Sequence, residues 1–173
     1  MLQGCGDPMS KKNSLTCMQF FVTNLNSYMA FKKINSVRLL AKDLTLNYKR
    51  VESWIYFSKT PSIITLDIVA DRMNVLTYDL IGKKIFFLGK DKKTIIANNS
   101  PPLFCRNLRK FLNKIDIKSA DEFSSYFEEK ISKHTYYSYF RKSNPMIPSL
   151  KTAEEIAELL GLQLYDLIKR GDL

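Results

Sequence analysis

The chain has 173 residues, of which 45% are hydrophobic, 12% aromatic and 25% charged, enough for a packed core in one ordinary domain or two small ones. Its 27 Lys and Arg against 17 Asp and Glu give a formal net charge of +10, which favours a polyanionic partner and above all nucleic acid. No stretch approaches the ~20 apolar residues that a membrane-spanning helix needs, so no membrane partner is expected.

Cysteine and histidine are too sparse for a metal site. Cys5, Cys17 and Cys105 are odd in number and widely spaced, which fits reduced thiols in a cytoplasmic protein. His134 is the only histidine and no close pair of cysteines exists, so we expect no zinc site. The first six residues lack the basic region and apolar run of a secretory signal, and none is expected there.

The first half of the chain contains five helical patterns in succession. Their apolar residues recur at helical spacing, and a serine or asparagine that can cap free amide groups precedes the second, third and fourth. The expected helices cover residues 15–31 and 37–43, a third that opens at Asn47, a fourth that starts at Ser62, and a short fifth over residues 75–80 that Gly82 ends.

The second and third of these patterns meet at a tight polar break. The third helix would bury Val51, Trp54 and Ile55 and leave Tyr48 and Lys49 on its outer face. A short outward helix that begins with a cap, an aromatic residue and two cations is typical of helices that read a DNA major groove. An ordinary helical pair in a small core has the same pattern, and both interpretations stay open at this point.

The pattern changes after the fifth helix. Residues 85–88 and 94–97 are β-prone runs on either side of a polar stretch, which predicts a hairpin, while a connecting linker fits the same residues and stays open as the alternative. Ser100 followed by Pro101 and Pro102 predicts the start of another helix, because proline lacks only an amide that the first turn leaves unused.

The second half of the chain then repeats the first. The offset between equivalent residues is 83, and it grows to 85 and then to 87 through two short insertions that fall in expected turns. Core positions keep their apolar character, as in Leu40 and Phe123 or Trp54 and Tyr139, whereas surface positions differ. The repeat indicates a duplicated structural unit.

Both halves share one extended spacing of residues. In the first half it comprises Leu40-Ala41, Leu46-Asn47, Val51, Trp54, Pro61-Ser62-Ile63, Leu66, Val69-Ala70-Asp71, Val75 and Asp79-Leu80. In the second half it comprises Ile131-Ser132, Tyr136, Tyr139, Pro148-Ser149-Leu150-Lys151-Thr152, Ile156-Ala157, Leu160-Gly161 and Asp166-Leu167-Ile168. With this spacing the chain resembles the lambda-repressor/Cro type of helix-turn-helix family, also called the Xre family. The resemblance implies an all-α fold of two tandem five-helix domains over residues 14–82 and 102–171, connected by a linker or short β-hairpin over 83–101.

The resemblance also implies that the third helix of each domain enters the DNA major groove. The implied contacts of the first domain, to base edges or phosphates, are Asn47, Tyr48, Lys49, Arg50, Ser53 and, in the following loop, Lys59. Those of the second domain are the cap Ser132, then Lys133, His134 and Ser138, and Arg141 and Lys142 in the loop. Cations and helix N-termini suit phosphates, and Lys can donate to guanine.

Four positions depart from the family's pattern. Val37 and Ala120 replace the glutamine that commonly begins the second helix and braces the recognition helix against phosphate. Thr45 and Phe57 stand where glycine is frequent, which predicts distorted turns.

Two further residues weaken the second domain as a DNA reader. Glu128 and Glu129 put negative charge near its turn, where DNA would approach, so this domain could instead be an architectural or dimerising copy. The first hypothesis is a transcriptional repressor or regulator that binds double-stranded DNA, with homodimerisation left open. The alternative is a repurposed helix-turn-helix protein that binds another protein, such as an antirepressor or an inhibitor of a nucleic-acid enzyme encoded by a mobile element.

No arrangement typical of catalysis is visible. The acidic pairs at residues 121–122, 128–129 and 154–155 are adjacent on expected helices and therefore point apart. Isolated glycines form no phosphate-binding loop. We therefore expect a protein that is not an enzyme and that uses no cofactor and no metal.

Overall fold

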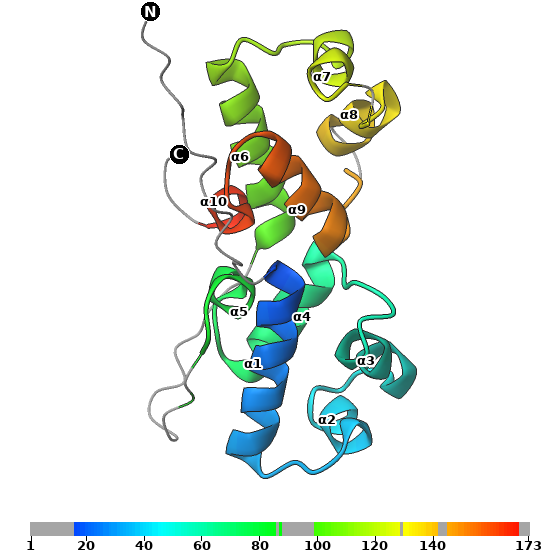
Figure 1. Cartoon of the computed structure of the whole chain (residues 1–173), viewed down its shortest axis with the longest axis vertical. Coiled ribbons are helices and arrows are strands. Elements are labelled where there is room, and N and C mark those ends of the chain that lie inside the picture. The colour runs from blue at the N-terminus through cyan, green and yellow to red at the C-terminus, as the bar shows by residue number, and fades with distance from the viewer. Residues whose placement is uncertain (1–15, 86, 88–98, 129, 142–144, 170–173) are drawn as a thin grey trace, which may run out of the picture.

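The computed structural model describes residues 16–85, 87, 99–128, 130–141 and 145–169, and these are mostly helical, with a single β-bridge and no strand among them. Within these residues the helices follow one another in two sets of five (Figure 1). The first set is α1 (Cys17–Lys32), α2 (Val37–Asp43), α3 (Tyr48–Ile55), α4 (Ile63–Met73) and α5 (Thr77–Gly82). The second is α6 (Ser100–Lys114), α7 (Ala120–Tyr126), α8 (Lys133–Phe140), α9 (Leu150–Leu159) and α10 (Leu164–Ile168).

Side-chain caps begin most of these helices. In each case an oxygen accepts a hydrogen bond from the third backbone N–H of the helix, which would otherwise lack a partner. The capping residues are Thr16, Ser36, Asn47 and Ser62 in the first set and Ser119, Ser132 and Ser149 in the second. The expected helix starts at Ser36, Asn47 and Ser62 are therefore confirmed.

An edge-on aromatic pair lies at the centre of each set. The rings of Phe21 in α1 and Trp54 in α3 are 5.6 Å apart between centroids, and those of Phe104 in α6 and Tyr139 in α8 are 6.0 Å apart. All four side chains are buried, and the two pairs occupy positions that the sequence repeat matches. Such contacts stabilise by about 0.5–1.5 kcal/mol beyond burial, so each third helix is anchored to the first helix of its own set.

A buried asparagine ties the beginning of each set to its end. The Asn24 amide donates to the carbonyls of Leu80 and Lys83, both at 2.8 Å. Its counterpart Asn107 donates to the carbonyls of Leu167 and Lys169, at 3.1 and 3.2 Å. Carbonyls at the end of a helix lack intrahelical hydrogen-bond donors, and the side-chain amides of Asn24 and Asn107 supply these donors.

The two sets meet through a reciprocal backbone contact. The Ile63 amide donates to the Pro148 carbonyl at 3.2 Å, and the Leu150 amide donates to the Pro61 carbonyl at 2.8 Å. These two bonds form the antiparallel bridge between Ser62 and Ser149, the caps of α4 and α9. Equivalent residues of the two sets therefore contact each other.

Two carboxylates repeat this reciprocity at helix N-termini. Glu154 of α9 accepts from the first amide of α1, that of Cys17, at 2.7 Å. Asp67 of α4 accepts from the first amide of α6, that of Ser100, at 2.8 Å, and from the Thr77 hydroxyl at 2.7 Å. A negative charge is favourable at a helix N-terminus, so each set supplies the anion that the other set's first helix needs.

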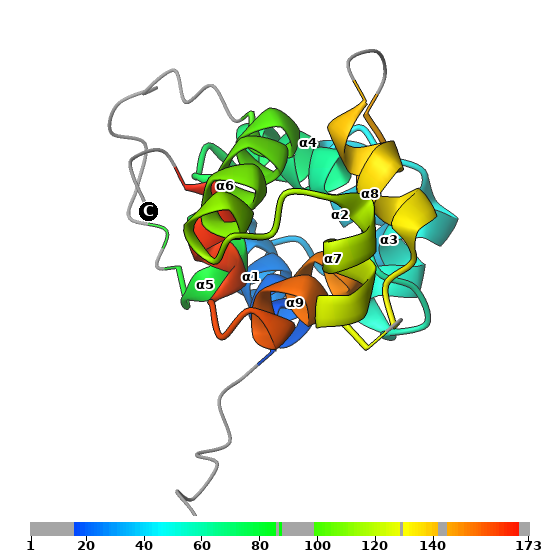
Figure 2. The same ribbon diagram turned by 90° about the horizontal axis from the view of Figure 1, so that it is seen from above.

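Helix packing across the junction follows the same rule. Helix α5 packs against α10, α1 against α9, and α4 against α6. If each helix is replaced by its equivalent in the other set, the pair α1–α9 becomes α6–α4 and the pair α5–α10 is unchanged. Such a pattern is that of a twofold interface, here within one chain. As a result, α2 and α3 lie at one end of the long axis and α7 and α8 at the other, on the same side of the molecule (Figures 1 and 2).

The fifth helix differs from its prediction. It begins at Thr77 rather than Val75, and Gly82 is its last residue rather than its stop. Asn74 causes the difference, because it adopts the left-handed conformation with φ 56° and ends α4. Its equivalent in the second set is Gly161, with φ 68°. Val75 and Leu76 then separate Asn74 from the first residue of α5.

The turns after α2 and α3 close without glycine. Thr45 and Phe57 adopt the left-handed conformation with φ 52° and 55°, which costs an L-residue about 1–2 kcal/mol. The turn after α2 is completed by the Leu46 amide, which donates to the Ala41 carbonyl at 2.8 Å. The expected distortion is therefore replaced by regular turns that contain a strained residue.

Most of the expected hairpin, residues 86 and 88–98, lies outside the described residues. Next to it, the Ile85 amide donates to the Asn24 side-chain oxygen at 2.8 Å, and the Phe87 ring meets that of Tyr28 edge-on at 5.3 Å. This part of the connection therefore packs on α1. No helix in the described ranges combines the length and the apolar character needed to cross a membrane.

We predict that Trp54→Ala lowers the free energy of unfolding by about 3–5 kcal/mol, because it empties a fully enclosed site between α1 and α3. Chemical denaturation followed by circular dichroism measures the loss. Tyr56→Ala, at a side chain that is 70% exposed, is the control and should change stability little. An unchanged unfolding curve for Trp54→Ala would contradict the prediction.

We also predict that Asp67→Ala destabilises the chain by about 2–4 kcal/mol, because the Ser100 amide and the Thr77 hydroxyl lose their buried acceptor. Glu154→Ala should cost only about 1 kcal/mol, because the bond to Cys17 is partly exposed and water can replace the carboxylate. Denaturation of the two variants side by side measures the difference. Equal losses would contradict the greater weight given to the Asp67 side of the junction.

Candidate nucleic-acid interface

Helix α3 is short and held from one side only. Val51 and Trp54 are buried against the first set of helices, while Asn47, Lys49 and Arg50 are exposed. The Asn47 side chain accepts from the Arg50 amide at 3.3 Å, so the cap fixes the helix start beside the two cations. The N-terminal turn of α3 therefore presents positive charge outward from a rigid support.

Two neighbours hold Tyr48, one through its hydroxyl and one at its ring. Its hydroxyl donates to the carboxylate of Glu52, one turn later in α3. The guanidinium of Arg38 in α2 lies 5.5 Å from the ring centroid. The hydrogen bond to Glu52 raises the pKa of the Tyr48 hydroxyl, which therefore stays protonated at neutral pH. Tyr48 is half-buried, so part of its side chain is accessible at the start of α3.

A concave surface of about 380 Å³ lies between α3 and the loop that leads to α4. Lys49, Arg50 and Lys59 line it, and the lining formed by described residues contains no carboxylate. Ser53 also lines it, but its hydroxyl donates to the Arg50 carbonyl at 2.7 Å, so it offers an acceptor rather than a donor to a ligand. Three cations around one hollow are suited to an anion such as a phosphate.

Helix α8 occupies the equivalent place in the second set with different chemistry. Its cap Ser132 accepts from the Thr135 amide at 3.3 Å, and Ser132, Lys133 and His134 are exposed. Lys133 forms an ion pair with Asp121 in the first turn of α7. The cation expected to contact DNA thus already has an acidic neighbour in its own domain.

Three predicted contacts of the second domain have different outcomes. Ser138 is only 5% exposed, which leaves little of its side chain for contact with a base. Residues before α9 contact this helix, since the Met146 amide donates to the Ser138 carbonyl at 2.7 Å. Arg141 is exposed after the end of α8. Lys142 lies outside the described residues.

Two residues that help to shape the surface have no counterpart in the predicted set. Arg38 lies against Tyr48, and Asp121, which matches Arg38 at the offset of 83, pairs with Lys133. Both belong to the second helix of their set, so a pattern confined to the third helix misses them. Comparing equivalent positions of the repeat for charge would have found this exchange.

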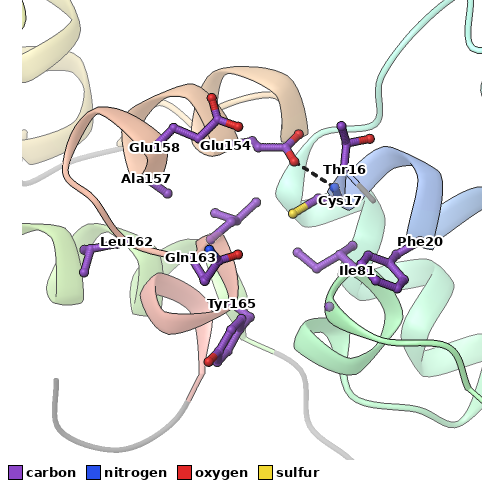
Figure 3. Close-up of a pocket in the computed structure, with 12 residues that line it drawn as sticks. Thr16, Cys17, Phe20, Ile81, Glu154, Ala157, Glu158, Leu162, Gln163 and Tyr165 are labelled. Atoms are coloured by element: carbon purple, nitrogen blue, oxygen red, sulfur yellow. Dashed lines mark hydrogen bonds between the residues drawn. The ribbon is translucent and has the colours of Figure 1, made fainter. Parts of the chain in front are cut away.

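A second hollow of about 170 Å³ lies at the junction, between α1 and the end of α5 on one side and α9 and α10 on the other (Figure 3). Burial raises the pKa of the Cys17 thiol, and the nearby Glu154 raises it further. The thiol therefore stays protonated and is a poor nucleophile. The described residues that line this hollow include no Lys, Arg or His, so it is unsuited to nucleic acid.

No family model, no curated protein and no solved structure matches this chain. Among the residues that the structure describes, no group of three or more His, Cys, Asp or Glu could hold a metal ion. The interpretation of the surface therefore depends on its geometry and charge.

Proposed function

We propose that the chain is a non-enzymatic, cytoplasmic protein that binds double-stranded DNA sequence-specifically, as a transcriptional repressor or regulator. In this proposal each set of five helices is a lambda-repressor-like helix-turn-helix domain, and the N-terminus of α3 enters the major groove. The supporting observation is that α3 buries Val51 and Trp54 while it presents Lys49 and Arg50 beside Lys59.

The cations of this surface have different tasks. Lys49 lies in the first turn of α3, where a side chain in the groove can donate to the acceptors of guanine. Arg50 and Lys59 flank the hollow between α3 and its following loop, where phosphates of the adjacent strand would lie. Tyr48, held by Glu52 and Arg38, contributes an aromatic side chain beside Lys49.

The relation between the two sets also fits a DNA partner. Successive major grooves on one face of a duplex are about 34 Å apart. Helices α3 and α8 lie on one side of the molecule, toward opposite ends of its long axis (Figure 1). One chain could therefore cover the length of duplex that separate subunits of a homodimer usually cover.

A second candidate function is binding to another protein through α7 and α8. The observation that favours it is that two large aromatic side chains of these helices, Tyr126 (48% exposed) and Tyr137 (62% exposed), are exposed, as are the acidic Asp121 and Glu122 of α7. Aromatic side chains on the surface are typical of protein interfaces. A gel shift with random duplex at two salt concentrations separates the two functions. Selective enrichment of sequences supports the regulator, and weak, unselective retention supports the interaction protein.

We predict that Lys49→Ala loses about 1–3 kcal/mol of discrimination between a selected and a random duplex. Lys83→Ala is the matched control, because Lys83 pairs with Asp79 at the end of α5, away from α3 (Figure 1). Fluorescence anisotropy with both duplexes at fixed salt measures the ratio of affinities. Wild type and Lys49→Ala binding both duplexes alike would overturn the assignment of base reading to α3.

A further inference from the structure

The two helix-turn-helix segments have equivalent folds and opposite charge. Residues 37–55, which comprise α2 and α3, contain four basic and two acidic residues, a net charge of +2. Residues 120–140, which comprise α7 and α8, contain two basic and four acidic residues, a net charge of −2. A duplex that approaches the side shared by α3 and α8 would therefore be attracted at one end and repelled at the other.

One exchanged pair of contacts lies at the N-terminus of the third helix, the end that would enter a groove. In the first set Arg38 lies against Tyr48 and leaves the neighbouring Lys49 exposed without an acidic partner in the described contacts. In the second set the equivalent positions hold Asp121 and Lys133, which form an ion pair. The Asp121 carboxylate thus neutralises Lys133, the cation at the start of α8, and also repels phosphates.

A second carboxylate beside this pair is held firmly. Glu122 accepts from the amides of Lys118 and Ser119 at 2.7 and 3.0 Å, and these bonds lower its pKa. It stays ionised at neutral pH and cannot turn away without losing the capping box of α7. The buried Ser138 removes a further side chain that could have contacted a base.

We propose that α8 faces a major groove without selecting its bases, and that Asp121 is the residue that prevents α8 from contacting them. This inference rests on the proposed function. The operator then has one specified half-site, read by α3, and a neighbouring groove that the chain covers without selecting its bases. The reciprocal junction holds α8 toward that groove, and the charges of α7 prevent close contact.

The first test is a base-by-base substitution of the duplex that wild type selects from a random pool. Changes in the half-site under α3 should lower affinity about 5- to 150-fold each, which corresponds to about 1–3 kcal/mol per base pair. Changes one helical turn away should alter affinity less than about twofold. Two equally constrained half-sites would overturn this inference and leave DNA binding standing. Failure to select any duplex would overturn the proposed function and this inference together.

The second test reverses the exchanged charge. Asp121→Arg restores the residue type found at Arg38, and it should steepen the salt dependence of log K by about 1–2, as expected for one or two additional phosphate contacts. A second block of selected bases should appear under α8. Asp166→Arg is the control, with the same change of charge at an ion-paired residue of α10, and should leave the selected sequence unchanged. An Asp121→Arg protein with an unaltered salt slope and a single block of bases would overturn the role of Asp121.

Discussion

Two carboxylates join the halves of the chain, and the junction depends most on the buried one, that of Asp67. The first amide of α1 and the first amide of α6 each donate a hydrogen bond to a carboxylate, and in both cases the accepting carboxylate belongs to the opposite set. Asp67 is 6% exposed, and a buried carboxylate is tolerated only where hydrogen bonds replace its hydration. Thr77 supplies one of these bonds from within the same set and Ser100 supplies the other from the opposite set, so separating the halves would remove one of the two hydrogen bonds to a buried carboxylate. This requirement fixes α3 and α8 relative to each other.

A symmetric interior and an asymmetric surface follow from the same duplication. Inside, volume and packing limit change, so Phe21 with Trp54 is matched by Phe104 with Tyr139 in the same edge-on contact. Outside, a substitution costs little stability, and charge can vary freely. The α2–α3 and α7–α8 segments therefore differ in charge, although their helices follow the same order.

Interactions between residues close in sequence made the helices predictable, whereas the contacts between residues far apart in sequence could not be predicted. Caps such as Ser36 and Asn47 and the apolar spacing placed the helices, because both act within a few residues. The bonds from Ser100 to Asp67 and from Cys17 to Glu154 join residues 33 and 137 positions apart, which no periodicity reports. At the surface, the spacing of the third helix predicted Ser138 as a DNA contact, but the burial of a side chain depends on tertiary packing that this spacing does not report.

A tandem chain allows an asymmetry that a homodimer does not. In a twofold homodimer every surface residue occurs twice about the axis, so an acidic residue that repels DNA at one reading helix also repels it at the other. Here the position held by Arg38 in one set is held by Asp121 in the other. Covalent connection also keeps the second set at high effective concentration, so it needs no DNA affinity of its own to remain in place. Under the proposed function, the second set can therefore lose the selection of bases while its interior continues to support the first.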